Sequence, residues 1–212
     1  MRRPKFEVIC VLAALLLCAF LSMPAAQAAR RESNRGIRLD KPIPTDRETI
    51  VGTLDNGMRY YIRENKESPN RAVLRLVVNA GSILEDDDQL GLAHFVEHMG
   101  FNGTKHFPKQ DLIRYLESVG VNLGAWRSGV NASTGFDQTA YYMTIPTDSE
   151  RIVENGVRIL ADWAHGTSME DVEIEKERGV ITEEWRRRLG AGDRFLDKHL
   201  PVIFKDSRYA ER

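Results

Sequence analysis

Cysteine is almost missing from this chain of 212 residues, since its two copies, Cys10 and Cys18, both lie in the first twenty positions. The rest of the chain can form neither disulfides nor thiolate metal sites, so a metal site there must use histidine, aspartate or glutamate. A strong charge of either sign is also missing: the net charge is -1, and we expect no nucleic-acid partner. Hydrophobic residues (42%) and charged residues (29%) have the proportions of a folded globular protein, which excludes a disordered or fibrous one.

The first 28 residues have the pattern of an export signal. Basic residues in the first five positions precede the uncharged run Val8–Met23, and a small-x-small sequence ends at Ala28. The run has 16 residues, fewer than the roughly 20 that a membrane-spanning helix needs. We therefore expect a signal peptide over 1–28, cleaved after Ala28 or Ala29, with an uncleaved membrane anchor as the alternative. The protein would then meet the membrane only during export and would work in the periplasm or outside the cell.

Residues 29–46 are polar, and we interpret them as a leader to a domain that covers 47–212. Hydrophobic periodicity predicts strands at 49–54, 58–63, 72–79 and 138–145, and helices at 89–99, 108–119, 146–164 and 169–189. Asp55-Asn56-Gly57 is typical of a hairpin turn. Strands come first and helices later, which indicates an α+β fold with a mostly antiparallel sheet packed with helices.

Two features predict where helices begin. The acidic run at 85–88 suits the N-terminus of the helix at 89–99, because a helix dipole favours negative charge there. Ser168 and Asp171 have the spacing of a capping box at the start of the helix at 169–189.

The residues with the clearest chemical meaning form the sequence HFVEH, from His94 to His98. Two histidines four residues apart leave a helix from one face and can share an ion, and Glu97 lies on the adjoining flank. Two neutral imidazoles and one carboxylate leave the fourth position of a tetrahedral zinc ion open, which is the pattern of a catalytic site. The alternative is an exposed helix with two unrelated histidines.

A third metal ligand must come from another part of the chain, and the helix at 169–189 offers two candidates. Glu177 and Glu184 are seven residues apart and so lie on one helical face. The spacing does not choose between them. We interpret the other glutamates of this helix as a solvated face with local ion pairs.

Three segments of the chain together resemble the pitrilysin/insulinase metallopeptidases. The stretch GSILEDDDQLGLAHFVEHMGFNGTKHFP is similar to the family's zinc signature, and the two glutamates seven residues apart match its second signature. NASTGFDQTAYY resembles a strand beside the family's active site. The resemblance covers about 49–212 and extends to the exported bacterial zinc proteases within the family.

The resemblance implies one Zn²⁺ per chain, with His94, His98 and Glu184 as its ligands. Glu97 would be the general base that takes a proton from a zinc-activated water. Glu177 would be an accessory acid beside the ligands. The implied function is a zinc-dependent endopeptidase that hydrolyses peptide bonds in a peptide or a small protein.

The resemblance also bears on substrate binding and on assembly. Asn131 and Ala132 match positions that hold the backbone of a substrate bound as an added β-strand. Family members consist of paired homologous halves, so we expect one catalytic half-domain, truncated at its C-terminal end, and a second half or partner subunit. The alternatives are a non-catalytic peptide-binding half, a fragment of a larger two-half protease, and a domain that binds zinc for stability.

Overall fold

The computed structural model describes residues 44–124 and 129–212, so the expected signal peptide and most of the expected leader lie outside the described residues. The chain divides into two compact units at Asn65 and Lys66, and each unit is described by itself. In the part of the chain that the structure describes, no helix combines the length and the apolar character needed to cross a membrane.

The first unit contains an antiparallel hairpin of β1 (Thr49–Thr53) and β2 (Arg59–Arg63). The turn between the strands requires a left-handed backbone, which Gly57 supplies with φ of 86°. The side chain of Asn56 accepts a hydrogen bond from the backbone N–H of Met58 at 3.0 Å. The hairpin turn predicted at Asp55-Asn56-Gly57 is therefore confirmed.

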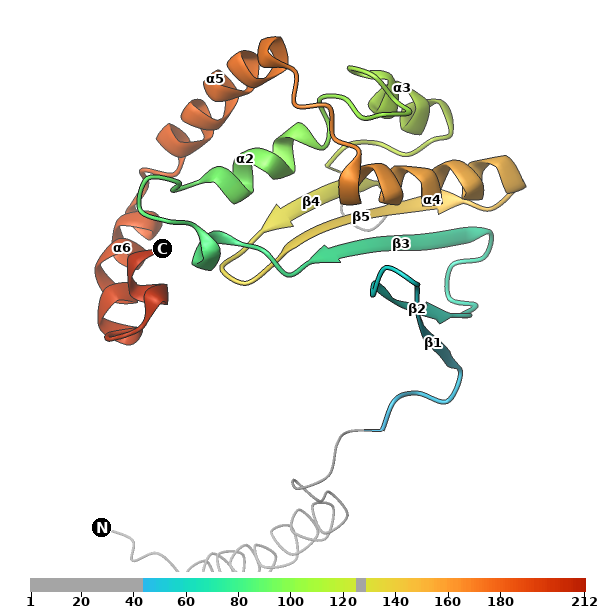
Figure 1. Cartoon of the computed structure of the whole chain (residues 1–212), viewed down its shortest axis with the longest axis horizontal. Coiled ribbons are helices and arrows are strands. Elements are labelled where there is room, and N and C mark those ends of the chain that lie inside the picture. Colours follow the sequence, from blue (N-terminus) through green and yellow to red (C-terminus); the bar gives the residue numbers. More distant parts are fainter. Residues whose placement is uncertain (1–43, 125–128) are drawn as a thin grey trace, which may run out of the picture. The chain divides into compact units, whose positions relative to one another are not determined.

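The second unit is built on a three-stranded antiparallel sheet with the order β3-β5-β4 (Figure 1). The strands are β3 (Arg71–Val78), β4 (Val130–Thr134) and β5 (Thr139–Pro146). The predicted strands at 72–79 and 138–145 agree with β3 and β5 to within a residue at each end. β4 has no counterpart among the strands predicted from periodicity.

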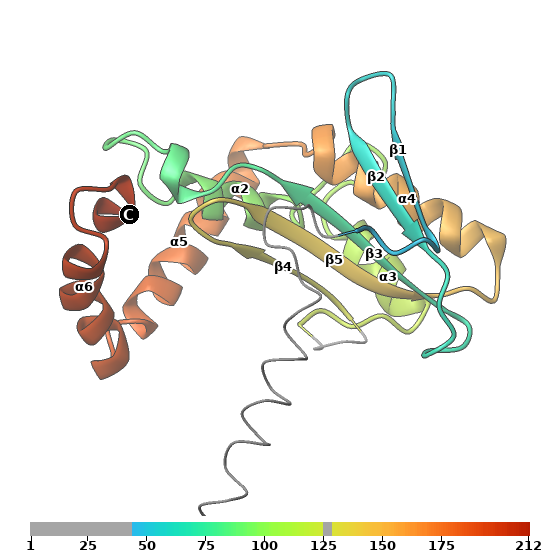
Figure 2. The ribbon, with the colours of Figure 1, turned by 90° about the horizontal axis from the view of Figure 1, so that it is seen from below.

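Helices pack on one face of this sheet. The structure contains α2 (Leu92–Met99), α3 (Asp111–Ser118), α4 (Glu150–His165), α5 (Asp171–Arg187) and α6 (Ala191–Ile203), with short 3₁₀ turns η1 (Ser82–Leu84) and η2 (Arg208–Glu211). α4 contacts β3 and β5, and α2 contacts β4 and β5, as both views of the ribbon show (Figures 1 and 2). The predicted α+β class is confirmed, although α6 is not among the predicted helices.

The core lies between the sheet and these helices. Its fully buried side chains come from α3, β4, β5, α4 and the loop after α3: Leu112, Leu116, Val121, Val130, Met143, Ile145 and Ile159. Trp163 stacks on Tyr141 with ring centroids 5.1 Å apart and donates a hydrogen bond of 2.9 Å to the carbonyl oxygen of Gly100. This bond ties α4 to the end of α2, the helix that carries the HFVEH sequence.

The start of α5 differs from the prediction, because Ser168 and Asp171 form no capping box. α5 begins after Glu170, and no side chain caps it. Ser168 instead donates its backbone N–H to the carbonyl oxygen of Gly103 at 2.9 Å, and Met169 has φ of 47°, so the chain is still turning there. No residue of α5 is buried, but its half-buried residues recur at helical spacing: Glu173, Ile174, Glu177, Ile181 and Glu184.

A buried carboxylate fixes the loop that follows α2. Asp162 of α4 is 1% exposed and accepts hydrogen bonds from the Thr104 hydroxyl at 2.7 Å and the His106 backbone N–H at 3.0 Å. Its second oxygen lies 2.7 Å from Nδ1 of His106. Burial by itself would raise the pKa of Asp162, but the hydrogen bonds from Thr104 and His106 outweigh it and hold the pKa below its ordinary value.

We expect Asp162→Asn to lower the free energy of unfolding at pH 7 by about 1–3 kcal/mol, because hydrogen bonds to a buried charge are lost. The pKa of Asp162 is lower in the folded chain than in the unfolded chain, so its stabilisation is present above the unfolded value and is lost as pH falls through the folded one. The gap between wild type and variant should therefore narrow below about pH 4. Urea unfolding at pH 7 and pH 3 measures this gap, with the exposed Asp148→Asn as control. A gap of the same size at both values would contradict the account.

Candidate metal centre

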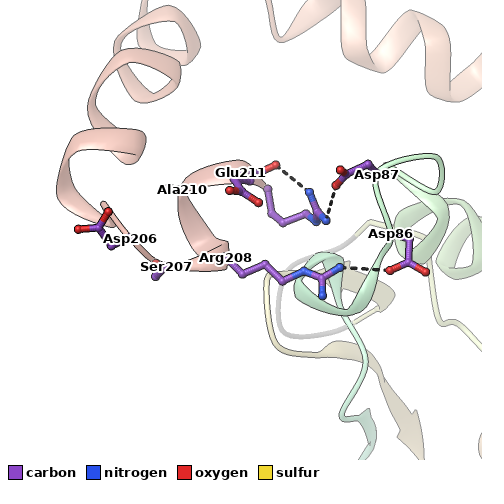
Figure 3. Close-up of a pocket in the computed structure, with 8 residues that line it drawn as sticks. Asp86, Asp87, Asp206, Ser207, Arg208, Ala210 and Glu211 are labelled. Atoms are coloured by element: carbon purple, nitrogen blue, oxygen red, sulfur yellow. Dashed lines mark hydrogen bonds and ion pairs between the residues drawn. The ribbon is translucent and has the colours of Figure 1, made fainter.

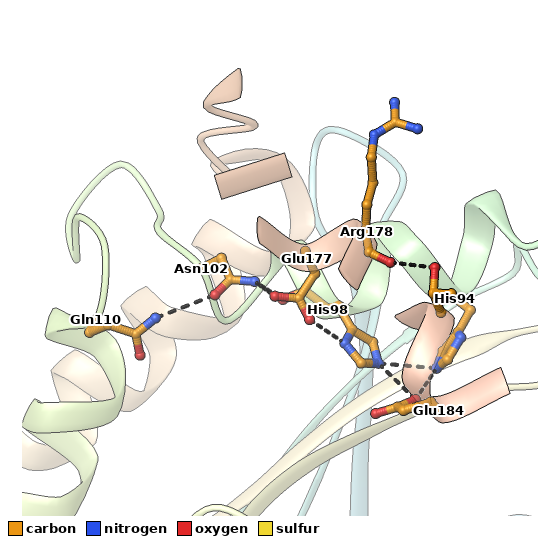
Figure 4. A network of polar contacts seen from close by, with 8 residues as sticks. His94, His98, Asn102, Gln110, Glu177, Arg178 and Glu184 are labelled. Atoms are coloured by element: carbon orange, nitrogen blue, oxygen red, sulfur yellow. Dashed lines mark hydrogen bonds and ion pairs between the residues drawn. The ribbon is translucent and has the colours of Figure 1, made fainter. Parts of the chain in front are cut away.

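Two helices bring three potential metal ligands together (Figure 4). His94 and His98 lie one turn apart on α2, and their Nε2 atoms are 3.1 Å apart. Oε2 of Glu184, from α5, lies 3.6 Å from each of these nitrogens. In the described residues, this is the group of three histidine, cysteine or acidic side chains whose ligand atoms all lie within 4.8 Å of one another.

The separations fit a zinc ion. With zinc–ligand bonds of about 2.0–2.1 Å, two ligand atoms of a tetrahedral site lie about 3.3–3.4 Å apart. The observed separations of 3.1, 3.6 and 3.6 Å bracket this value. Two imidazole nitrogens and one carboxylate oxygen are also the donor set of catalytic zinc sites, which keep a fourth position for water or substrate.

The surroundings of His94 favour the form of its ring that binds a metal. Burial, and after it the neighbouring His98, lowers the pKa of His94, and the attraction of Glu97 and Glu184 does not outweigh these effects. His94 is therefore held toward the neutral form, which is the form that binds a metal. The Nε2 atoms of His94 and His98, 3.1 Å apart, can bind one positive ion through their lone pairs.

The geometry separates the two glutamates that spacing left undecided. Oε1 of Glu177 lies 2.7 Å from Nδ1 of His98, on the opposite side of the ring from Nε2. A carboxylate in this place accepts a hydrogen bond from Nδ1–H and so leaves the Nε2 lone pair for a metal. Glu184, whose oxygen faces both Nε2 atoms, lies with the candidate ligands, and Glu177 lies behind one of them.

Glu97 lies on the flank of α2 that faces the sheet. Its side chain is only 7% exposed, and its Oε2 accepts a hydrogen bond of 2.5 Å from the hydroxyl of Thr134 at the end of β4. The hydroxyl limits the positions that this carboxylate can take beside the two histidines. Thr134 is absent from the residues that sequence reasoning selects, because periodicity predicts no strand at β4 whose alternation would place its side chain on this face.

Asn131 and Ala132 lie on β4, which is an edge strand of the sheet. On the edge away from β5, Val130 exchanges hydrogen bonds with Asn122 and Gly124. Alternation along the strand puts the N–H of Ala132 on the same edge, where it meets Oδ1 of Asn131 at 2.9 Å. The side chain of Asn131 belongs to the sheet face opposite to that of Thr134, so the structure does not bring it to the candidate ligands.

Glu85 supports the start of α2, a role that its position in the sequence alone does not reveal. Its buried carboxylate accepts hydrogen bonds from the backbone N–H groups of Gly91 and Ala93, both at 2.8 Å, at the start of α2. The predicted helix at 89–99 begins at Leu92 instead, and Glu85 is the acid of the 85–88 run that bonds to its first turn. The negative charge of Glu85 at the N-terminus of α2 is favourable, because the helix dipole is positive at that end.

Arginines near the end of the described chain hold the loop that contains Glu85. Arg208 contacts Asp86 at 3.5 Å, and Arg212 contacts Asp87 at 3.0 Å (Figure 3). Both arginines also donate to the carbonyl oxygen of Glu85. The cavity of about 780 Å³ beside them is lined by acids and by these paired arginines, and it contains none of the candidate ligands.

Comparison with known proteins identifies the family. A model of the Insulinase family (Peptidase family M16) matches residues 60–201. This chain belongs to peptidase family M16. It is 38% identical over 170 residues to the probable zinc protease PqqL of Escherichia coli, which covers 80% of this chain and 18% of that protein. It is 36% identical over 199 residues to the probable zinc protease PqqL of Haemophilus influenzae, which covers 94% of this chain and 20% of that protein.

Solved structures confirm the expected half-domain fold. The crystal structure of the first half of the periplasmic protease PqqL from Escherichia coli matches with a TM-score of 0.76 and 38% identity, over 81% of this chain and 36% of that one. The M16 domain described here spans about a fifth of the length of the curated PqqL relatives.

Proposed function

We propose that this chain is the catalytic half of a zinc-dependent endopeptidase. The observation that carries the proposal is the group of His94, His98 and Glu184, whose ligand atoms have separations of 3.1–3.6 Å in a domain of the M16 family. Relatives that share 36–38% of their residues with the chain are named as zinc proteases. Two imidazole nitrogens and one carboxylate oxygen are a donor set that suits one Zn²⁺ ion, and we propose that these three residues bind it.

Each residue beside the three ligands has a distinct role in the proposal. Zinc, when bound, would supply the Lewis acidity that makes a water acidic and polarises a peptide carbonyl. Glu97 would accept the proton from the attacking water and pass it to the leaving amine, and Thr134 would hold the carboxylate for this transfer. Glu177 would keep the ring of His98 in the tautomer that binds the metal.

The edge of β4 supports the proposed mode of substrate binding. An extended peptide can add to an exposed strand through backbone hydrogen bonds, which makes recognition only weakly dependent on side chains. The N–H of Ala132 lies on this edge and is held by Asn131, so the amide of Asn131 would have to release it to a substrate. We propose that Asn131 and Ala132 bind the substrate backbone in this way, and that the substrate is a peptide or a small protein.

A second half and an export route complete the proposal. The curated relatives are about five times as long as the matched region, and the Escherichia coli relative has a described first half. We therefore propose that a second homologous half or partner subunit closes over the site. The same relative is described as periplasmic, which supports 1–28 as a signal peptide, 29–46 as a leader, and a periplasmic or extracellular location.

The proposal predicts metal-dependent peptide cleavage by the full chain. A mixed peptide library should be hydrolysed at internal bonds, and a zinc chelator should remove the activity because the water would lose its activating ion. One equivalent of zinc added after removal of the chelator should restore it, as mass spectrometry of the products would show. Cleavage that is insensitive to the chelator would contradict the mechanism. A folded, zinc-bound full chain without cleavage would favour an incomplete catalytic half that needs the proposed second half or partner subunit.

A further inference from the structure

The carboxylate of Glu177 is held from two sides. Its Oε1 lies 2.7 Å from Nδ1 of His98, and its Oε2 lies 2.5 Å from Nδ2 of Asn102 (Figure 4). Asn102 lies in the turn that ends α2, four residues after His98, and its backbone N–H donates to the carbonyl oxygen of Met99 at 3.0 Å. The same short segment therefore provides a candidate ligand and a partner for the carboxylate behind that ligand.

The chemistry of the contact fixes the orientation of the Asn102 amide. An ionised carboxylate accepts hydrogen bonds and donates none, so the group that faces Glu177 must be the NH₂ of Asn102. The amide oxygen then points the other way, where Nε2 of Gln110 donates to it at 3.3 Å. Gln110 thus holds Asn102, Asn102 holds Glu177, and Glu177 holds His98.

We propose that Asn102 is a positioning residue for the zinc ligand His98 and acts through Glu177. By occupying Oε2 of Glu177, it keeps Oε1 directed at the Nδ1–H of the ring, so the lone pair of Nε2 stays directed at the ion. The proposal rests on the proposed function, since it assigns a role around the same metal centre. Asn102 contacts neither the ion nor the substrate in this account, so it is not a catalytic residue.

The surroundings of Asn102 make the role testable by substitution. Asn102, Gln110 and Glu177 line a cavity of about 570 Å³. A smaller side chain at 102 would enlarge this cavity without opening the core between the helices and the sheet. Leucine has the branching of asparagine at Cγ and no hydrogen-bonding group, and its larger methyl groups can extend into the cavity, so Asn102→Leu removes the donor while the position stays filled. A residue that only filled space would tolerate this change.

The experiment measures zinc affinity in the full chain by competition with a chromophoric chelator, alongside kcat and KM for a peptide. Asn102→Leu and Asn102→Ala should each weaken zinc binding by about tenfold, the lower end of the range for a partner of a metal ligand, because Asn102 acts through that partner. The value of kcat should fall while KM changes by less than about twofold, because substrate contacts are kept. Asn155→Ala, at a half-buried asparagine of α4 that bonds to Arg158, is the matched control and should bind zinc like wild type.

The outcomes separate the two proposals. Zinc affinity and kcat of Asn102→Leu equal to those of wild type would overturn the role of Asn102 and leave the proposed protease intact. A wild-type chain that neither binds zinc nor cleaves peptides would overturn both. If the leucine variant failed to fold, the alanine variant, which only removes atoms beside the cavity, would still decide between a tenfold loss of affinity and no loss.

Discussion

Glu97→Gln should reduce kcat by about 10²–10⁴-fold, the range that a general base contributes, while zinc remains bound. Glutamine has the shape of glutamate and can still accept the hydrogen bond of Thr134, but it cannot take a proton from water. The three candidate ligands are unchanged, so the metal content should equal that of wild type. Single-turnover cleavage of a peptide, with zinc measured by atomic absorption on the same sample, tests both parts.

A matched control for this result is Glu117→Gln, which makes the same chemical change at an exposed position of α3. It should leave both kcat and zinc content unchanged. Wild-type cleavage by the Glu97→Gln protein would exclude Glu97 as the base. Loss of zinc from that protein would instead indicate that Glu97 supports the metal site.

Glu184→Ala should abolish stoichiometric zinc binding, because it removes the only carboxylate oxygen that lies within 3.6 Å of both Nε2 atoms in the described residues. Glu177→Gln should have a smaller effect, a loss of affinity of about 10–100-fold, because it disturbs the partner of His98 and keeps all three ligands. Equilibrium dialysis against buffered zinc distinguishes a lost ligand from a weakened one.

The pair of variants decides between the two glutamates, which spacing alone could not do. Glu183→Gln, next to Glu184 on the exposed side of α5, is the control and should retain wild-type affinity. If the Glu184→Ala protein still bound one equivalent of zinc and the Glu177→Gln protein bound none, Glu177 would be the ligand and Glu184 the residue beside it. Activity should follow zinc content in every one of these proteins, since the proposed chemistry depends on the ion.

The local parts of the candidate site could be predicted from the sequence because helical geometry fixes them. A spacing of four residues places His94 and His98 on one face, and three residues place Glu97 on the adjoining flank. The choice between Glu177 and Glu184 depends on the register of α5 against α2, a tertiary relation that no local pattern contains. The resemblance to a family supplied that assignment, and in the structure Glu184 is the glutamate whose oxygen lies 3.6 Å from both Nε2 atoms.

The residues that hold the site were missed for the same reason. Thr134 is 37 residues from Glu97 in sequence, and Asn102 is 75 residues from Glu177. Threonine and asparagine occur in any loop or turn, so only their contacts in space reveal a role. The capping box at Ser168 shows the converse error, since a correct local motif lost to a tertiary hydrogen bond with Gly103.

The elements themselves were predictable where hydrophobic patterning was strong. β5 alternates buried and half-buried residues over most of its length, whereas β4 has the sequence VNAST in a stretch rich in glycine and serine. Such a strand has weak intrinsic preference and forms because β5 offers it a partner. α6 begins with Ala191 and Gly192 and contains Pro201, so helix propensity alone argues against it.

The absence of buried residues in α5 has a consequence for the stability of this helix. α5 contacts α2, where Glu177 and Glu184 face the two histidines, and no residue of α5 is buried. An ion shared by Glu184 and the two histidines would therefore act as a cross-link between the helices. Part of its binding free energy would appear as resistance of α5 to local unfolding. Metal affinity and the ordering of this helix are thus two measures of one equilibrium.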